Sequence, residues 1–233
     1  MSVLLEKTSV AGLLLVDKPQ GWTSHDVVAA VRRLLPKKTR VGHTGTLDPM
    51  ATGLLVLLVG RATKSAARHQ GLDKTYEGSI RLGLETDTGD LDGKTVKTAP
   101  VPGCTARDLQ AVMDRFHGEV VLPVPQYSAV KRGGRPLYEY ARRGLEVPVV
   151  SRASRISSWE LRSWEPPEAS FRLDCSSGTY ARSLAVLLGN ELGCGGTLSR
   201  LRRERVGPFS LQDAKTLEQL KDDGVEAHLR HEG

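Results

Sequence analysis

The chain has 233 residues, of which 39% are hydrophobic and 26% charged, and it carries a formal charge of +6 with a pI near 9.3. This length can bury an apolar core and still form a cleft, so stability needs no metal or disulfide. The three cysteines are odd in number and lack the C-x-x-C spacing of zinc sites, and the longest apolar run is far short of the roughly 20 residues of a membrane span. We therefore expect a soluble, cytoplasmic protein without a membrane anchor.

The positive charge is clustered rather than spread along the chain. Three clusters stand out: Arg32, Arg33, Lys37, Lys38 and Arg40; Lys131, Arg132, Arg135, Arg142 and Arg143; and Arg200, Arg202, Arg203 and Arg205. Such clusters are typical of surfaces that bind nucleic-acid phosphates, but they also occur as solvated basic faces. Charge alone leaves both interpretations open.

The first third of the chain combines short apolar strands with one amphipathic helix. Gly12–Val16 predicts a buried strand, Thr23 the N-cap of a helix, and Leu54–Val59 a second buried strand. Residues 75–84 then alternate between apolar and polar side chains. This alternation predicts a half-buried strand with Tyr76 on its apolar face.

The remaining elements favour strands over helices. Thr105 and Asp108 predict the capped start of a helix that we expect to end at Gly118. Strands are predicted at 119–122, 147–151, 155–164, 169–175 and 197–206, and helices at 136–144, 180–192 and 214–222. Because strands outnumber helices without alternating regularly with them, we predict an α+β fold on a mixed, largely antiparallel central sheet. No repeat or linker appears, so residues 1–233 are predicted to form one domain.

The motif GDLDGKT (Gly89–Thr95) resembles known phosphate-handling loops. It is one residue short of the P-loop pattern, and Asp90 and Asp92 would repel a phosphate, so a surface turn is favoured. DLDGKT also resembles the loop of aspartate-nucleophile phosphatases, which remains the weakest alternative because no buried strand precedes it. On the favoured interpretation, Asp90→Asn should leave activity nearly unchanged. The six histidines lie too far apart to predict a metal site.

The segment RVGHTGTLDP (Arg40–Pro49) holds a single carboxylate, Asp48, in a stiff loop of glycines and threonines. Alone, it is explained by a turn before a strand. A second polar stretch, CSSGTYARSL (Cys175–Leu184), places Tyr180 and Arg182 where a predicted strand passes into a helix. An arginine there could meet a carboxylate, although a surface cation is the simpler alternative.

Together these stretches resemble the tRNA pseudouridine synthase B family, which isomerises a uridine in the T-loop of tRNA. Six segments match in the family's order, from about Gly12 to about Leu220, and chance agreement over all six is not credible. They are VDKPQGWTSHD (16–26), GHTGTLDPMATGLL (42–55), ATK (62–64), KTYEG (74–78), CSSGTYARSL (175–184) and GCGGTLSRLRRERVG (193–207). The resemblance implies the pseudouridine synthase fold and a bacterial-type isomerase acting on uridine 55 of tRNA.

The resemblance also implies roles for individual residues. Asp48 would be the catalytic aspartate, Arg182 its ion-pair partner, and Tyr76 a catalytic residue that packs against the flipped-out base. The residues implied in substrate binding are His43, Lys64, Tyr76, Tyr180 and Leu201. An RNA-contacting insertion is expected at about 124–150, whereas the C-terminal RNA-binding domain of longer relatives is expected to be absent.

The chemistry explains why one carboxylate can suffice. The reaction breaks the N1–C1′ bond, rotates the uracil and rejoins it through C5, and a uracil anion delocalises its own charge on leaving. Asp48 could attack C1′, add to C6 or remove a C2′ proton, and the sequence leaves these three routes open. A nearby cation such as Arg182 would favour its ionised form.

No step of this reaction is a redox change or a phosphoryl transfer, so the resemblance implies no cofactor and no metal. The expected partner is the T-arm of tRNA, with no obligate protein partner. An RNA chaperone or binding module with the same fold is the alternative function. The presence of Asp48, Tyr76 and Arg182 argues against it.

Overall fold

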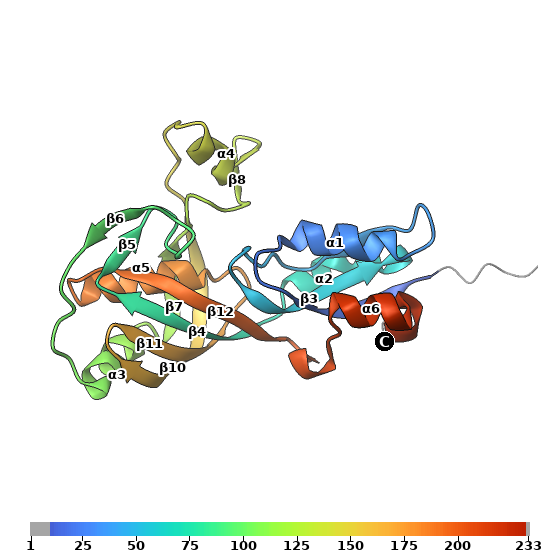
Figure 1. The fold of residues 1–233 in the computed structure, drawn as a ribbon. Helices are drawn as coiled ribbons and strands as arrows, with labels where there is room; N and C mark the ends of the chain where they lie inside the picture. Colours follow the sequence, from blue (N-terminus) through green and yellow to red (C-terminus); the bar gives the residue numbers. More distant parts are fainter. Residues whose placement is uncertain (1–9, 232–233) are drawn as a thin grey trace, which may run out of the picture. The chain divides into compact units, whose positions relative to one another are not determined.

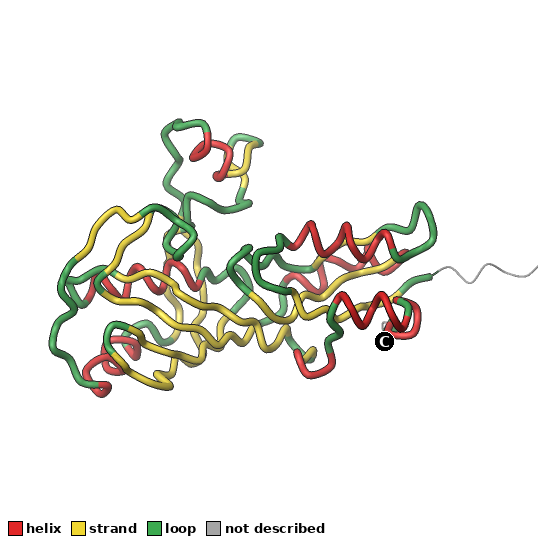
Figure 2. The backbone as a smooth tube through the Cα atoms, in the orientation of Figure 1, coloured by secondary structure: helices red, strands yellow, loops and turns green. Residues whose placement is uncertain are grey.

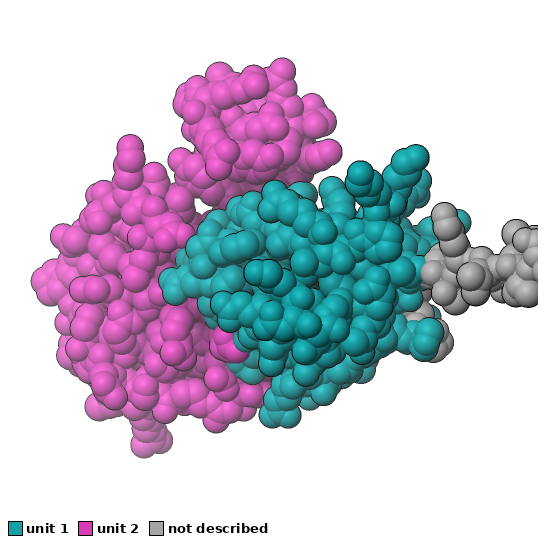
Figure 3. Space-filling view, turned by 45° about the vertical axis from the view of Figure 1, so that its right-hand side comes forward, with its two compact units in different colours: residues 1–72, 203–233 teal, residues 73–202 magenta. Residues whose placement is uncertain are grey.

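The computed structural model describes residues 10–231, and the chain folds into two compact units (Figure 3). The first unit contains residues 1–72 and 203–233, and the second contains residues 73–202. Strand β12 (Gly196–Val206) crosses the boundary, so its first part belongs to the second unit and its last part to the first. Among the described residues, no helix is both long and apolar enough to cross a membrane.

The first unit is built on β3, which has β1 on one edge and the end of β12 on the other (Figure 1). Its elements are β1 (Gly12–Lys18), α1 (Ser24–Arg33), β2 (Val41–His43), β3 (Thr52–Val59), the 3-10 helix η1 (Gly60–Ser65), α2 (Ala66–Gln70), β13 (Phe209–Ser210), η2 (Leu211–Asp213), α6 (Leu217–Asp223) and η3 (Val225–His228). The predicted strands at Gly12–Val16 and Leu54–Val59 are therefore confirmed. Thr23 caps α1 as predicted, because its side chain accepts the Asp26 amide and Asp26 in turn accepts the Thr23 amide.

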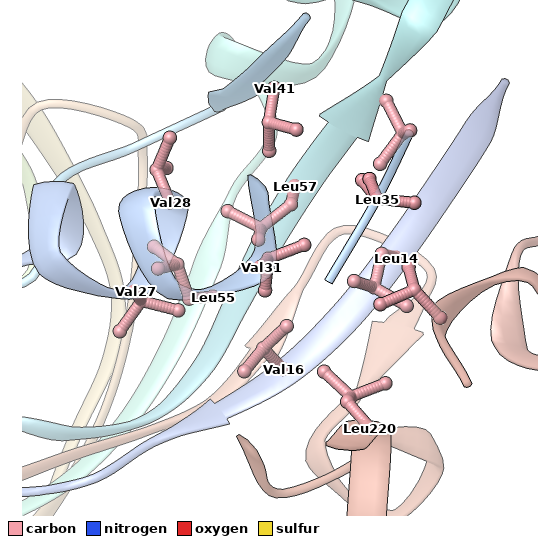
Figure 4. Packing of buried hydrophobic residues seen from close by; sticks show 12 residues of the cluster. Leu14, Val16, Val27, Val28, Val31, Leu35, Val41, Leu55, Leu57 and Leu220 are labelled. Carbon is pink, nitrogen blue, oxygen red and sulfur yellow. The ribbon is translucent and has the colours of Figure 1, made fainter. Parts of the chain in front are cut away.

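Strand β3 is apolar from Leu54 to Val59, and both of its faces are buried there. It pairs antiparallel with β1, with Leu14 opposite Leu57 and Val16 opposite Leu55. One face packs against α1 and α6, as Figure 4 shows for the apolar side chains of this cluster. The other face forms a second apolar cluster with Ala62 and Val206. A continuous apolar run, rather than alternation, is the pattern expected of a strand covered on both sides.

The second unit contains a sheet in the order β12, β4, β11, β10, β7, in which the pairs β4–β11, β11–β10 and β10–β7 are antiparallel. Its elements are β4 (Lys74–Leu82), β5 (Leu84–Thr86), β6 (Thr95–Thr98), α3 (Ala106–Asp114), β7 (Gly118–Pro123), β8 (Lys131–Arg132), β9 (Arg135–Pro136), α4 (Leu137–Arg142), β10 (Ser151–Glu165), β11 (Glu168–Cys175) and α5 (Ala181–Glu191). Figure 2 shows how far strands dominate this part of the chain. Helix α3 packs against β10, where Trp159 contacts the rings of Phe116 and Phe171.

Two predicted boundaries are wrong. The helix that starts at Thr105 ends at Asp114, and Gly118 instead opens β7 with a φ of 90°. Residues 147–150 form no strand, and Val149 is 94% exposed. Their valines give the composition of a strand, but no neighbouring strand pairs with them apart from one hydrogen bond from Val124 N to Val150 O (2.8 Å). Propensity does not make a strand where no partner is present.

The predicted insertion at 124–150 forms a small lobe of the second unit, which contains β8, β9 and α4 (Figure 1). Gly133 and Gly134 connect β8 to β9 with φ values of 56° and 81°, which is the conformation that a two-residue hairpin turn requires. Pro136 precedes α4, and Leu137 is fully buried. The lobe therefore has a small anchor of its own among otherwise exposed basic residues.

Candidate active site

The Asp48 loop connects β2 to β3 in the first unit. The chain leaves β2 at His43, and the Ala51 amide donates to the Asp48 carbonyl (3.1 Å) in a turn that opens β3. Asp48 is half-buried, whereas Leu47 and Met50 on either side of it are buried. The apolar neighbours anchor the loop in the core and leave the carboxylate at its surface.

Arg203 of β12 fixes the first part of this loop. Its guanidinium donates from Nε to the Leu54 carbonyl (2.8 Å), from Nη2 to the Gly45 carbonyl (3.0 Å) and from Nη1 to the Thr46 carbonyl (3.3 Å). Arg203 is only 2% exposed. A planar fork with several donors can hold a loop and a strand in one geometry, which a single ammonium group cannot do.

Two residues near the N-terminus fix the second part of the loop. Ser24 accepts the Leu47 amide (2.9 Å) and donates to the Leu47 carbonyl (3.1 Å). The Lys18 ammonium, fully buried, donates to the carbonyls of Trp22 (2.6 Å), Pro19 (2.9 Å) and Pro49 (3.4 Å). Leu47 and Pro49, on either side of Asp48, are thus both held by residues that precede the loop in the sequence.

The buried cations create a positive environment around Asp48. Burial lowers the pKa of Lys18 to about 8, attraction by Asp48 acts in the opposite direction, and repulsion by Arg203 lowers it further. Burial also lowers the pKa of His43, with smaller contributions from His25 and Arg203, so this ring is neutral near pH 7. Positive charge near a carboxylate favours its ionised form.

His43 lies on β2, next to the Asp48 loop. Its ring meets that of His25 edge-on at 5.3 Å. Its Nδ1 is buried and has no hydrogen-bond partner among residues 10–231. A buried ring nitrogen of this kind is available to a ligand.

Arg182 occupies the second position of α5 in the second unit and is 4% exposed. A cation at a helix N-terminus opposes the helix dipole, so it needs other partners. Arg182 donates to the carbonyls of Thr88 (3.0 Å) and Tyr127 (3.1 Å), and its Nε lies 3.6 Å from the carboxylate of Asp90. The predicted alternative, a surface cation, is wrong.

Asp90 is also buried, which corrects the prediction of a surface turn. It is 5% exposed, and its carboxylate accepts hydrogen bonds from the Thr88 hydroxyl (2.6 Å) and the Asp92 amide (3.2 Å). The Leu198 amide donates to the Gly89 carbonyl (3.0 Å) and thereby joins this loop to β12. Asp90 is therefore a structural partner of Arg182.

The other predicted site residues of the second unit lie on three elements. Tyr76 is buried on β4 opposite Leu173 of β11, as the alternation predicted. Tyr180 is the N-cap of α5 and is partly exposed, and Leu201 is 7% exposed on β12. Strands β4 and β12 are neighbours in the sheet.

Lys64 lies apart from the Asp48 loop within the first unit. It is exposed on η1, which follows the C-terminal end of β3, whereas Asp48 precedes the N-terminal end of that strand. The distance along β3 is on the order of 25 Å for eight residues at roughly 3.3 Å each. The structure therefore does not bring Lys64 and Asp48 together.

The sequence alone did not indicate that Lys18, Asp90 and Arg203 are buried supports of the candidate site residues. For Arg203 a signal exists, because Leu201 and Arg203 share the inward phase of β12 and a charge at such a position is unusual. For Lys18 the signal is weaker, because it ends an apolar strand where a polar residue is ordinary. Among the described residues, no group of three His, Cys, Asp or Glu side chains is arranged to hold a metal ion.

Comparison with known proteins identifies the family. Residues 32–181 match the model of the TruB family pseudouridylate synthase N-terminal domain, and residues 182–231 match that of the tRNA pseudouridylate synthase B C-terminal domain. The chain is 49% identical to tRNA pseudouridine synthase B of Aromatoleum aromaticum, over 93% of this chain and 70% of the relative. It is 50% identical to tRNA pseudouridine synthase B of Opitutus terrae, over 90% of this chain and 87% of the relative.

Solved structures support the same assignment. A chain of the Cbf5–Nop10–Gar1 complex is 31% identical and superimposes with a TM-score of 0.69, over 91% of this chain and 54% of that chain. A chain of an archaeal box H/ACA Nop10–Cbf5 complex is 29% identical, with a TM-score of 0.66 over 93% of this chain and 57% of that chain. The predicted pseudouridine synthase fold, α+β on a mixed and largely antiparallel sheet, is confirmed, as is the predicted class of enzyme, an isomerase. The chain belongs to the TruB family of pseudouridylate synthases.

Proposed function

We propose that this enzyme isomerises uridine 55 in the T-loop of tRNA, with Asp48 as the catalytic carboxylate. The observation that supports this best is the immobilised Asp48 loop, which two buried cations and a buried serine hold on both sides of the half-buried acid. A carboxylate that must act at one sugar carbon needs such a support. The relatives named tRNA pseudouridine synthase B support tRNA as the substrate.

The reaction needs an ionised carboxylate that is held in one position. Lys18 and Arg203 support this state, because both are buried cations that hold the backbone around Asp48 and add positive charge near its carboxylate. We infer that Arg182 acts on the same uridine as Asp48. Its buried contacts with Asp90 and two carbonyls would give its guanidinium a fixed direction.

The base must leave the stack of the T-loop before it reaches Asp48. In this proposal Tyr76 packs against the flipped uracil, which offsets part of an unstacking cost of a few kcal/mol. His43, Tyr180 and Leu201 contact the base and its neighbours, and the unpartnered Nδ1 of His43 is suited to a hydrogen bond with the RNA. After C1′ is joined to C5, the C5 proton must leave and N1 must gain a proton, and the Tyr76 hydroxyl is our candidate for the first transfer.

The lobe at 124–150 is proposed to contact RNA as a lid. Its segment 131–143 carries five cations against Glu139 alone, and all five cations are exposed. We propose that both units act together as one catalytic domain, with tRNA as the partner and no obligate protein partner. Three free cysteines fit a reducing cytoplasm.

Release of tritium from C5 of labelled uridine tests the proposed function. A T-arm hairpin labelled at its T-loop uridine should lose tritium to water in proportion to enzyme turnover. The matched control hairpin carries the label only at a uridine in the stem and should release none. Equal release from both hairpins would refute T-loop specificity, and no release from either would refute the activity.

The lid proposal has its own test. Trypsin should cut the free protein first within 131–143, and the hairpin should protect this segment. An RNA-bound protein that is cut there as fast as the free protein would show that the lobe does not contact the RNA.

A further inference from the structure

The end of the first unit that lies farthest from Asp48 along β3 carries a basic pocket. It has a volume of about 700 Å³ and is formed by the turn after α1 and by η1 after β3. Five of its lining side chains are cations: Lys37, Lys38, Arg40, Arg61 and Lys64. Among residues 10–231, no acid lines the pocket and no carboxylate forms an ion pair with any of the five.

One lysine of this pocket, Lys38, has a strained backbone conformation. The turn from Pro36 closes with the Thr39 amide and hydroxyl donating to the Pro36 carbonyl (3.1 and 2.7 Å). Lys38, its third residue, has a φ of 72° and is the one non-glycine residue with a positive φ among those described. This conformation costs an ordinary side chain about 1 kcal/mol and is the natural position for glycine. A lysine that keeps such a position points to a use for its charge.

The charge, lining and volume of the pocket indicate the kind of ligand that it can bind. Five exposed cations without a neighbouring acid repel one another until anions arrive. In the part of the chain that the structure describes, no aromatic side chain lines the pocket, so these residues offer no surface on which a base could stack. Its volume exceeds what a single phosphate fills, which favours several phosphates along a nucleic-acid backbone.

The position of the pocket separates it from the catalytic loop. Strand β2 and the loop after it run antiparallel to β3, so Arg40 and Asp48 lie at opposite ends of that strand. Arg40 accepts the Gly60 amide (2.8 Å), which ties both walls of the pocket to the far end of β3. A nucleotide at Asp48 therefore cannot occupy this pocket, and only RNA on the order of 25 Å away can reach it.

We propose that this pocket, here called the β3-end pocket, binds the backbone phosphates of the RNA stem that continues from the flipped uridine. The proposal rests on the proposed function, since it takes the enzyme's substrate RNA as its ligand. It assigns Lys64 to stem phosphates rather than to the target nucleotide. Contacts of this kind position the RNA and are independent of its sequence.

Two hairpins with the same loop test the proposal. The stem of one hairpin is shorter than the length of β3, on the order of 25 Å, so it cannot reach the pocket. The stem of the other extends well beyond that length. The double variant Lys37→Gln/Lys38→Gln should weaken binding of the long hairpin about tenfold more than binding of the short one at low salt. It should also lower the salt slope for the long hairpin by about one per lost phosphate contact. The control, Lys97→Gln/Lys221→Gln, removes the same charge from exposed lysines elsewhere and should affect both hairpins alike.

A second variant guards against misfolding. Lys38→Gly relieves the backbone strain while it removes the charge, so its Tm should not fall below that of the wild type, although its affinity for the long hairpin decreases. Equal losses on both hairpins, or a Lys38→Gly variant that binds the long hairpin like the wild type, would overturn the proposal. If the wild type makes no pseudouridine in either hairpin, the proposed function fails instead, and the two failures are distinguishable.

Discussion

The Asp48 loop and the start of α5 both place a charged side chain near buried groups of opposite charge, but the signs of the charges are reversed. In the first unit a half-buried acid has buried cations around it, and in the second a buried cation, Arg182, has a buried acid, Asp90, beside it. In the first case, the cations Lys18 and Arg203 donate hydrogen bonds to backbone carbonyls, which hold the segments around Asp48 in place. In the second case the acid bonds directly to its surroundings.

This difference teaches how charge can be buried for chemistry or for structure. Near Asp48 the buried cations hold the backbone that carries the acid, whereas at α5 the buried acid lies beside the charged side chain that it orients. The substitutions below change one partner at a time, so each one tests which kind of burial it disrupts.

The largest effect is expected for Asp48→Asn. The amide keeps the size of the side chain but can neither attack nor accept a proton, so kcat should fall on the order of 10⁴-fold while tRNA affinity stays within a few fold. Single-turnover kinetics and filter binding separate the two quantities. Residual activity above about a hundredth of the wild type would move the catalytic carboxylate elsewhere.

Arg203→Lys should have the second-largest effect. The ammonium keeps the positive charge but cannot reach the carbonyls of Gly45, Thr46 and Leu54 together, so buried acceptors lose their donors at about 1–3 kcal/mol each. We expect a lower Tm and a kcat reduced roughly a hundredfold, with KM changed much less. Arg205→Lys is the control, because that side chain is exposed on the same strand. A kcat like that of the wild type at a temperature where the variant is folded would show that Arg203 supports the fold alone.

Asp90→Asn should have the third-largest effect, contrary to the expectation from the sequence, because Asp90 is buried beside Arg182. The amide still accepts from Thr88 but removes the negative charge 3.6 Å from the Arg182 guanidinium. Losing this charge should misdirect Arg182 and lower kcat about tenfold, which corresponds to about 1.4 kcal/mol. Asp92→Asn, an exposed neighbour, should leave turnover unchanged. An Asp90→Asn variant with full activity would mean that the two carbonyls are enough to orient Arg182.

The sequence predicted the elements whose patterns are local. Both capping boxes, at Thr23 and Thr105, follow from side chains three residues apart, and β3 follows from its continuous apolar run. The strand expected at 147–151 failed because pairing depends on a neighbour that local pattern does not specify. The Asp48 loop was proposed as the catalytic loop through a family resemblance, and the residues that hold it, Lys18 and Arg203, were not predicted.

The reason is the distance along the chain. Arg203 meets Gly45 and Thr46 across more than 150 residues, and Arg182 meets Thr88 across 94. A charged residue is normally exposed, so without the fold each of these arginines is most simply a solvated cation. Only tertiary packing shows that they are buried.

The smallest effect is expected from pH and concerns Lys18. With a folded pKa of about 8, its ammonium loses its charge in mildly alkaline solution, and with it one of three donors that hold the carbonyls around Trp22 and Pro49. Turnover should therefore decline a few fold as pH rises through about 8. Lys18→Arg stays protonated and should lack this part of the decline, while titration of the RNA itself affects both proteins equally.

Stability should change in the opposite direction over the same range. The folded pKa of Lys18 lies below its ordinary value of 10.5, so between about 8 and 10.5 the unfolded chain binds this proton more tightly than the folded one. The free energy of unfolding therefore rises with pH in that window, because the cost of burying the ammonium is fully present below about 8 and is relieved above it. Urea denaturation on both sides of pH 8 measures this rise, and Lys18→Met should remove it. If the stability of the wild type instead falls over this pH range together with its activity, the partners of Lys18 stabilise its ammonium more than burial destabilises it. The charge of Lys18 would then be the main support of the Asp48 loop.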